Sequence, residues 1–266
     1  MIPPDQERPV WRSLLYVPAN NPRFIEKAHT READAIILDL EDACPEDERP
    51  GARAALADSV RSVGQAGADV TVRINHDDWE ADIDAAVVSG VAALFVAKSE
   101  TPEQIRELDT AITGLEKSRD LPQGSIRLAL MIESPGALRR AAEIATASKR
   151  AVSLSLGGED FATAMHFAPD PETLELPKLM CLMAARETGL MPLGILGTVA
   201  DYSDLEGMRA TLARSAKFGF EGGSCIHPSL VPLLNKAFSP TPDAVAWAER
   251  VVTEYAAAQR QGKGAI

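Results

Sequence analysis

Short apolar runs rich in branched residues alternate along the chain with longer segments whose apolar residues recur at helical spacing. Eight of these runs are candidate strands, at residues 12–17, 35–40, 70–74, 93–96, 126–132, 151–156, 193–196 and 223–226. Strands that alternate with helices are typical of βα units and a mostly parallel sheet. The pattern therefore predicts an α/β protein, and eight units predict closure into a (β/α)8 TIM barrel.

Proline next to a capping residue marks where several helices should begin. Ser134-Pro135 precedes a helical segment at 137–145 and Thr101-Pro102 precedes another at 103–115, with Pro in the first turn. A last helix is predicted over 243–259. No repeat or Ser/Gly linker divides the sequence, so we expect an N-terminal tail at 1–10, one barrel domain at 11–239, and a short C-terminal helix and tail at 240–266.

Composition and charge narrow the class of protein. The 266 residues are 45% hydrophobic and 25% charged, which is ordinary globular composition. Subtracting 39 acidic from 27 basic residues gives a net charge of −12. Nucleic acid and anionic membrane surfaces are therefore not expected as partners. An anionic substrate must be met by a local basic pocket or by a metal ion.

The cysteines and the apolar runs indicate the cellular compartment in which the protein is expected. Cys44, Cys181 and Cys225 lie far apart without a Cys-x-x-Cys pair, so neither a disulfide framework nor a zinc site is indicated. The N-terminus lacks the apolar stretch of a signal peptide, and no apolar run approaches the about 18 residues that a membrane span needs. We expect a soluble, cytoplasmic protein.

Polar residues follow most of the predicted strands. In a barrel the active site lies at the carboxyl ends of the strands, so these side chains should meet on one rim although they are far apart in sequence. They are Asp39, Glu41, Asp42, Arg73, Asn75, Lys98, Glu133, Glu159, Asp160 and His227. No glycine-rich dinucleotide or nucleotide loop occurs.

Glu133 and Asp160 follow neighbouring predicted strands and offer the oxygen ligands that a hard divalent cation prefers. Mg²⁺ is the first candidate metal, and Mn²⁺ is also compatible because no Cys or His lies near these acids. Alternatively, Glu133 is a helix N-terminal acid and Asp160 caps a helix that starts at Phe161. Spacing leaves both interpretations open.

Arg73 ends a predicted strand with a guanidinium that can clamp a carboxylate through two parallel hydrogen bonds. The alternative is that Arg73 pairs with the excess acid on the same rim. Asp39, Glu41 and Asp42 are candidates to orient metal-bound water or to hold Arg73 in place.

Two further rim residues have acid-base or nucleophilic chemistry. His227 can act as a general acid or base, but a lone His before Pro is more often a structural residue, which we favour. Lys98 can hold an anion or form a Schiff base, but pairing with Glu or Asp is the ordinary case, and we assign it no catalysis.

Six ordered motifs resemble the citrate lyase beta subunit-like (CitE-like) group of the HpcH/HpaI aldolase superfamily. They are RSLLYVP (12–18), ILDLEDA (37–43), VRIN (72–75), IESPG (132–136), GGED (157–160) and IHP (226–228), in a match that runs from about residue 11 to 252. The resemblance implies a TIM barrel with a Mg²⁺ site. It also implies cleavage or formation of the carbon-carbon bond of a citryl, malyl or citramalyl coenzyme A thioester, which connects an acyl-coenzyme A with a 2-oxo acid.

The same resemblance implies roles for individual residues. Glu133 and Asp160 match the metal ligands, and Arg73 matches the arginine that binds the carboxylate of an oxaloacetate- or glyoxylate-like fragment, so these three are the predicted catalytic residues, and Glu133 also binds substrate. Residues expected to contact coenzyme A phosphates are Arg12, Arg23 and Lys27. The family also implies a homo-oligomer, a trimer or a multiple of one.

Position 42 distinguishes branches of the superfamily. Aldolases that act on free acids have a His where this chain has Asp42, which favours the lyase branch. Longer acyl-coenzyme A lyases bring a C-terminal Asp over a neighbour's active site, whereas this chain has no Asp beyond Asp243. We therefore expect water or another residue to transfer the proton. The alternatives are an aldolase of a free 2-oxo acid, or a non-catalytic subunit that binds Mg²⁺ and oxaloacetate within a larger complex.

Overall fold

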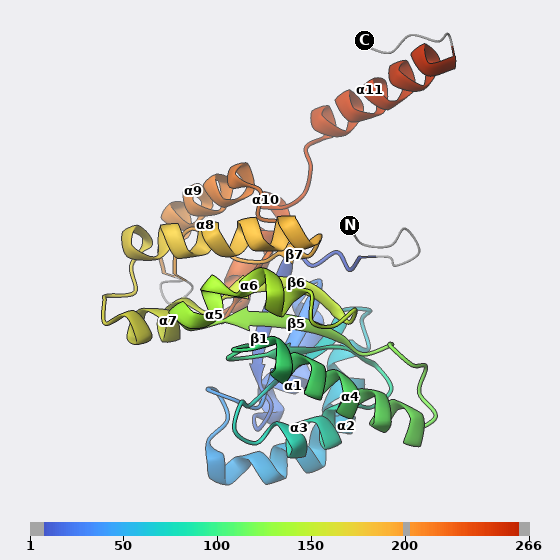
Figure 1. The fold of residues 1–266 in the computed structure, drawn as a ribbon, viewed down its shortest axis with the longest axis vertical. Helices are drawn as coiled ribbons and strands as arrows, with labels where there is room; N and C mark the ends of the chain where they lie inside the picture. The colour runs from blue at the N-terminus through green and yellow to red at the C-terminus, as the bar shows by residue number, and fades with distance from the viewer. Residues whose placement is uncertain (1–7, 199–202, 261–266) are drawn as a thin grey trace.

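The fold is a curved parallel sheet surrounded by helices, which a computed structural model describes for residues 8–198 and 203–260 (Figure 1). Eight parallel strands lie in the order β7-β6-β5-β4-β3-β2-β1-β8 in this part of the chain. The strands are β1 (Ser13–Pro18), β2 (Ala35–Asp39), β3 (Asp69–Ile74), β4 (Val91–Val96), β5 (Arg127–Ile132), β6 (Ala151–Leu156), β7 (Met191–Pro192) and β8 (Gly223–Cys225). An isolated parallel bridge between Leu193 and Gly222 joins the two ends of this order. The fold is therefore TIM-barrel-like.

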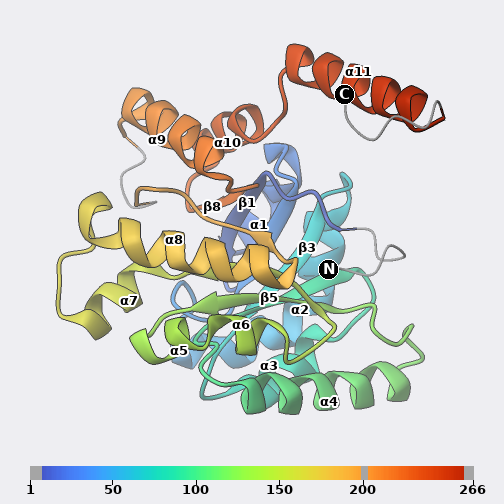
Figure 2. The same cartoon turned by 45° about the horizontal axis from the view of Figure 1, so that its top comes forward.

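Helices follow the strands and cover the outer face of the sheet (Figures 1 and 2). The α-helices are α1 (Pro22–Ala28), α2 (Arg49–Gly64), α3 (Trp79–Ala86), α4 (Pro102–Ser118), α5 (Pro135–Arg139), α6 (Ala141–Ala145), α7 (Gly158–Met165), α8 (Pro171–Thr188), α9 (Leu205–Phe218), α10 (Val231–Ala237) and α11 (Pro242–Arg260). Short 3-10 helices are η1 (His29–Arg31), η2 (Glu46–Glu48) and η3 (Pro228–Leu230).

Predicted helix starts are confirmed by their caps. The Ser134 hydroxyl accepts the Ala137 N–H before α5, and the Thr101 hydroxyl accepts the Gln104 N–H before α4. The helical segment predicted at 137–145 is two short helices that break at Arg140. The predicted last helix is α11.

Side chains along each strand alternate between two buried layers. Ile36 and Leu38 of β2 belong to the layer between sheet and helices, whereas Ala35 and Ile37 belong to a smaller cluster on the inner face. Because successive side chains in a strand point to opposite faces, the next inner position on β2 is Asp39. The same alternation directs Arg73, at the end of β3, to the inner face.

The seventh predicted strand, at 193–196, is wrong in position. The strand is Met191–Pro192, and the chain leaves the ladder at Gly194, whose φ of 147° is accessible mainly to glycine. A Cβ at Gly194 would also lie 3.1 Å from the Phe220 ring. Ile195 is buried in the core without extending the strand. The other seven predicted strands are confirmed, with ends shifted by at most two residues.

A buried ion-pair network lies at the amino end of β6. Arg150, which precedes this strand, donates to both carboxylate oxygens of Glu116 at 2.8 and 2.7 Å and to Asp109 at 2.5 Å. Glu116 is fully buried and also accepts the N–H groups of Gly124 and Ile126. Burial alone would raise the pKa of Glu116, but Arg150 and these N–H groups hold the pKa below its ordinary value.

Glu116→Gln is expected to lower the free energy of unfolding by about 3–5 kcal/mol at pH 7, because it leaves the Arg150 charge buried without its main partner. The folded-state pKa of Glu116 is depressed, so the carboxylate stabilises the protein above its unfolded-state pKa, and this contribution is lost as the pH falls through the folded-state pKa. Urea unfolding at pH 7 and pH 4 should therefore show a smaller difference between wild type and variant at pH 4. The exposed Glu107→Gln on the same helix is the control, and an equal deficit at both pH values would contradict the prediction.

Candidate functional site

A cavity of about 750 Å³ opens at the carboxyl ends of the strands. Its wall includes the ends of β1, β2 and β3, the residues that follow β5 and β6, and part of α1. The predicted rim residues among its lining are Asp39, Asp42, Arg73, Glu133, Glu159, Asp160 and His227. The structure therefore brings together side chains that the sequence separates by almost the whole length of the barrel.

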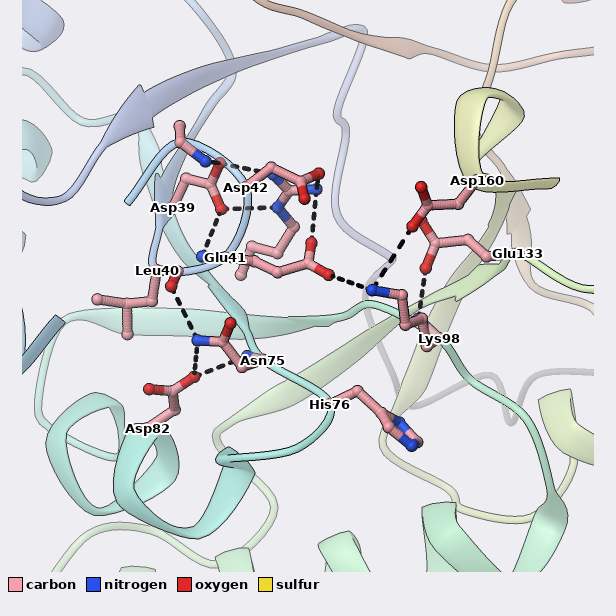
Figure 3. Close-up of polar contacts among 12 residues, drawn as sticks. Asp39, Leu40, Glu41, Asp42, Asn75, His76, Asp82, Lys98, Glu133 and Asp160 are labelled. Atoms are coloured by element: carbon pink, nitrogen blue, oxygen red, sulfur yellow. Dashed lines mark hydrogen bonds and ion pairs between the residues drawn. The ribbon is translucent and has the colours of Figure 1, made fainter. Parts of the chain in front are cut away.

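Arg73 contacts an acidic cluster whose members, Asp39, Glu41 and Asp42, lie close together in Figure 3. Its Nε and Nη2 donate to the two oxygens of Asp39 at 2.7 and 2.6 Å. Its Nη1 lies 2.8 Å from Glu41 and 3.0 Å from Asp42. Asp39 and Arg73 are direct neighbours in the ladder between β2 and β3, which explains the two-pronged contact. Arg73 is thus paired with the acids of its own rim.

The surroundings of Arg73 keep it charged. Burial alone would lower the pKa of Arg73, but the hydrogen bonds that Arg73 donates to Asp39 and the nearby negative charges raise it. The guanidinium carbon also lies 4.9 Å from the centre of the Tyr16 ring, a cation–π contact. Tyr16 was not predicted as a site residue, although the alternation along β1 places it on the inner face.

A polar contact below Arg73 fixes the loops after β2 and β3. Asp82, which is fully buried, accepts the Asn75 backbone N–H at 2.7 Å and its side-chain amide at 2.9 Å. The same amide donates to the Leu40 carbonyl oxygen at 2.8 Å, and Arg53 pairs with Asp82 at 2.7 Å. These contacts hold the Asp39 and Arg73 strands at a fixed spacing (Figure 3).

Lys98 links the two acidic groups of the rim. Its Nζ lies 3.2 Å from Glu41 and 3.5 Å from Asp160, while its backbone N–H donates to Glu133 at 2.5 Å (Figure 3). Burial alone would lower the pKa of Lys98, but Glu41 and the other acids raise it. The ion pairing predicted for Lys98 is therefore what the structure contains.

Glu133 is buried against a glycine. A Cβ placed on Gly157 would lie 2.4 Å from a Glu133 carboxylate oxygen, so only glycine leaves room for this side chain. Burial raises the pKa of Glu133 to about 8, and Glu41 and Asp160 add to the shift. Glu133 directly precedes the Ser134 cap of α5, and its carboxylate accepts the Lys98 backbone N–H.

Asp160 lies in the first turn of α7, next to Glu133 (Figure 3). The cap of α7 is Gly157, which corrects the alternative in which Asp160 caps a helix that starts at Phe161. No group of three His, Cys, Asp or Glu in residues 8–198 and 203–260 is arranged to hold a metal. Two adjacent carboxylates, Asp160 beside the Lys98 ammonium and Glu133 on the Lys98 backbone N–H, fit a hard cation that takes its remaining oxygen ligands from water or substrate.

The cations predicted to bind coenzyme A lie in different places. Lys27 of α1 lines the cavity, and so does Arg31 of η1, which the sequence analysis missed. Arg23 is exposed on α1 and is not among the lining residues. Arg12 precedes β1 at the amino end of the barrel, where Asp34 at 2.7 and 2.8 Å and Ser239 at 2.8 Å occupy its guanidinium. The structure thus does not bring Arg12 to the cavity, because strand direction places it at the opposite end.

His227 lines the cavity and caps η3. Its Nδ1 contacts the Ser229 hydroxyl at 2.7 Å and accepts the Ser229 N–H at 3.3 Å. These contacts are those of the structural residue that we favoured.

The fold and the cavity define a class: a TIM-barrel-like protein with a cavity at the carboxyl ends of its strands, lined by an arginine bound to carboxylates and by a pair of carboxylates. The chain belongs to the HpcH/HpaI aldolase/citrate lyase family, whose sequence profile matches residues 12–228.

Among the helices of residues 8–198 and 203–260, none has the length and apolar character of a membrane span.

Relatives with recorded activities align over nearly the whole chain. The citrate lyase subunit beta of Leuconostoc mesenteroides subsp. cremoris is 32% identical over 260 residues, which is 96% of this chain and 85% of that protein. The (3S)-malyl-CoA thioesterase of Cereibacter sphaeroides is 32% identical over 259 residues, covering 96% of this chain and 86% of the relative.

Solved structures agree with the fold. CitE of Mycobacterium tuberculosis in complex with magnesium, acetoacetate and coenzyme A is 27% identical with a TM-score of 0.69, covering 93% of this chain and 87% of that one. The M. tuberculosis citrate lyase beta subunit with oxaloacetate and magnesium is 26% identical with a TM-score of 0.68, covering 87% of this chain and 98% of that one.

Proposed function

We propose that this protein is a Mg²⁺-dependent carbon-carbon lyase that cleaves or forms a hydroxyacyl-coenzyme A thioester of citryl, malyl or citramalyl type. The observation that carries the proposal is the meeting of Glu133, Asp160 and Arg73 in one cavity at the carboxyl ends of the strands. Relatives named as a citrate lyase subunit and a malyl-CoA lyase, and a neighbour solved with magnesium and coenzyme A, support the reaction class.

Glu133 and Asp160 would hold the Mg²⁺, with Mn²⁺ as a substitute of the same ligand preference. The ion would polarise the carbonyl group that forms as the carbon-carbon bond breaks. Glu133 is suited to this role because Gly157 and the Lys98 N–H fix its carboxylate, and its raised pKa reflects a buried site that lacks a compensating cation.

Arg73 would bind a carboxylate of the 2-oxo acid fragment. Asp39 holds the guanidinium in place from the side, and Tyr16 supports its face. The side chain of Asp42 is 69% exposed and contacts only Nη1, so a substrate carboxylate can displace it at little cost. Lys27 and Arg31, which are exposed and line the cavity, would meet coenzyme A phosphates, and water would protonate the acyl-coenzyme A enolate.

The direct test is cleavage of malyl-, citramalyl- and citryl-coenzyme A by the purified protein with Mg²⁺, with EDTA, and with the Glu133→Gln variant. Metal-dependent release of a 2-oxo acid that the variant has lost is the expected result. Turnover of a free 2-oxo acid aldol without any thioester cleavage would instead establish the aldolase alternative. Binding of Mg²⁺ and oxaloacetate without any turnover would indicate a non-catalytic subunit of a larger complex.

We also propose that the protein closes its barrel fully over residues 11–239 and assembles into a homo-oligomer, a trimer or a multiple of one, in the cytoplasm. Helix α11 supports the assembly, because it stands away from the barrel in both views (Figures 1 and 2). It exposes Trp247, Val252 and Tyr255, whose apolar surface is costly to leave in water.

The proposed cytoplasmic location is supported by three buried free cysteines, which fit a reducing compartment.

Light scattering is expected to give about three chain masses or a multiple. Trp247→Ser combined with Val252→Ser should lower the mass to that of a single chain, because the apolar face of α11 is lost. The exposed Arg250→Gln on the same helix is the matched control and should leave the mass unchanged. A monomeric wild-type protein would contradict the assembly.

A further inference from the structure

Lys178 of α8 is a buried cation in the wall of the same cavity. Its exposed fraction is 7%, so more than nine-tenths of the residue is buried. It lines the cavity together with Glu133, Asp160 and Arg73. Its Cε lies 3.8 Å from the point that a Cβ on Gly158 would occupy. The side chain therefore lies beside the glycine pair at the start of α7.

The charge of Lys178 has no counter-ion among the described residues. Its ammonium group donates to the carbonyl oxygen of Gly197, and no acid of the described chain forms an ion pair with it. An ammonium group has three N–H donors, so two remain without an acceptor there. The other buried cations, Arg73 and Arg150, are each bound by carboxylates. A buried charge is ordinarily paired, because its burial is otherwise costly.

The pKa of Lys178 is consistent with a buried ammonium group that no carboxylate contacts among the described residues. Burial lowers the pKa of Lys178 to about 8, and Glu159 opposes that shift without contacting the ammonium. A bound anion would restore the missing counter-charge. A single carboxylate suits the space better than a phosphate dianion, because it carries less negative charge and Glu159 lies nearby. Phosphates are expected instead at Lys27 and Arg31, which are exposed and line the same cavity.

The position of Lys178 relative to Glu133 sets the kind of anion. Gly157 packs on Glu133 and the next residue, Gly158, packs on Lys178. Consecutive Cα atoms are about 3.8 Å apart, so the Glu133 carboxylate and the Lys178 Cε approach neighbouring residues of one segment. A small acid held at the carboxylate pair by its 2-oxo acid end can then place a second carboxylate near Lys178.

We propose that Lys178 binds the distal carboxylate of a dicarboxylic 2-oxo acid fragment and thereby makes the site prefer a thioester of citryl type. The inference rests on the proposed function for the identity of the reaction. Cleavage of a citryl thioester releases oxaloacetate, which has two carboxylates, whereas malyl and citramalyl thioesters release glyoxylate and pyruvate, which have one. The predicted consequence is a preference for dicarboxylic over monocarboxylic acids.

Calorimetry with saturating Mg²⁺ tests this preference with malate and lactate, the stable hydroxy-acid counterparts of oxaloacetate and pyruvate. The wild-type protein should bind malate about ten-fold or more tightly than lactate. Lys178→Met should remove that preference and leave lactate affinity within about two-fold. The variant loses only the charged hydrogen bond between the ammonium group and the distal carboxylate, which lactate lacks. Lys178→Arg retains the charge and should retain the preference.

Several outcomes would overturn the proposal. Equal affinity of the wild-type protein for the two acids does so without any variant. Equal loss of malate and lactate affinity in Lys178→Met, with Mg²⁺ binding intact, would show that Lys178 supports the loop at Gly197 and not the ligand. The readout is binding, so it is separate from turnover. A malate preference that depends on Lys178 in a protein that cleaves no thioester would contradict the proposed lyase and not this subsite.

Discussion

Glu133→Gln and Asp160→Asn are each expected to weaken Mg²⁺ binding by about ten-fold or more and to abolish thioester cleavage. Each substitution removes one of the two neighbouring carboxylates that line the cavity, while the shape of the side chain is nearly kept. Isothermal calorimetry of the purified variants with MgCl₂ measures the affinity, and the thioester assay measures the activity.

The fold should survive both substitutions. The Asp160 side chain is 43% exposed. Burial raises the pKa of Glu133 to about 8, so its surroundings in the metal-free protein disfavour the charged form, and the uncharged glutamine should be tolerated there. The free energy of unfolding without metal should therefore change by less than about 1 kcal/mol. The exposed Glu143→Gln on α6 removes the same charge outside the cavity and serves as the control. Unchanged Mg²⁺ affinity in both site variants would place the metal elsewhere.

Arg73→Ala is expected to abolish binding of a 2-oxo acid and to spare Mg²⁺ binding. Asp39 occupies one edge of the guanidinium, and its Nη1 group is the proposed donor to a substrate carboxylate, whereas no ion pair joins Arg73 to the proposed metal ligands Glu133 and Asp160 in the described residues. Calorimetric titration of pyruvate into the Mg²⁺-loaded variant should show no detectable binding. Normal binding would mean that another group clamps the anion.

Stability provides a second readout for Arg73. Without the guanidinium, the buried Asp39 loses its counter-charge and the buried Glu41 keeps only Lys98, so Arg73→Ala should also lower the free energy of unfolding by about 3–5 kcal/mol. Arg73→Lys keeps the charge but not the planar fork. It should bind pyruvate about ten-fold more weakly than wild type and lose less stability than the alanine variant. The exposed Arg61→Ala is the surface control.

The rim of the barrel was largely predictable from sequence. Asp39, Arg73 and Glu133 each follow an apolar run, and the alternation along β2, β3 and β5 directs all three inward. Lys98 follows β4, Asp160 lies in the first turn of the helix after β6, and the two side chains meet at the same place. The end of a strand can be recognised from neighbouring residues in the sequence. The side chains at that end could therefore be placed on the rim without knowing which other side chains they contact.

Residues whose environment depends on distant elements were assigned less well. Arg12 occurs in a motif next to a predicted strand, yet it lies before that strand and therefore at the amino end of the barrel. Lys178 gives no signal in the sequence, because its burial comes from α8 packing beside Gly158 and the segment at Gly197. Tyr16 had only its alternation on β1 to indicate that it faces Arg73.

The sequence by itself determined the βα order, the helix caps at Thr101 and Ser134 and the acidic rim, because hydrophobic periodicity and capping depend on neighbours within a few residues. The tertiary structure decided that Arg73 pairs with Asp39, that the seventh strand ends before Gly194, and that Lys178 has no counter-ion among the described residues. Ion pairing and burial are properties of groups brought together from distant positions, and their free energies depend on which partners share the same low-dielectric space.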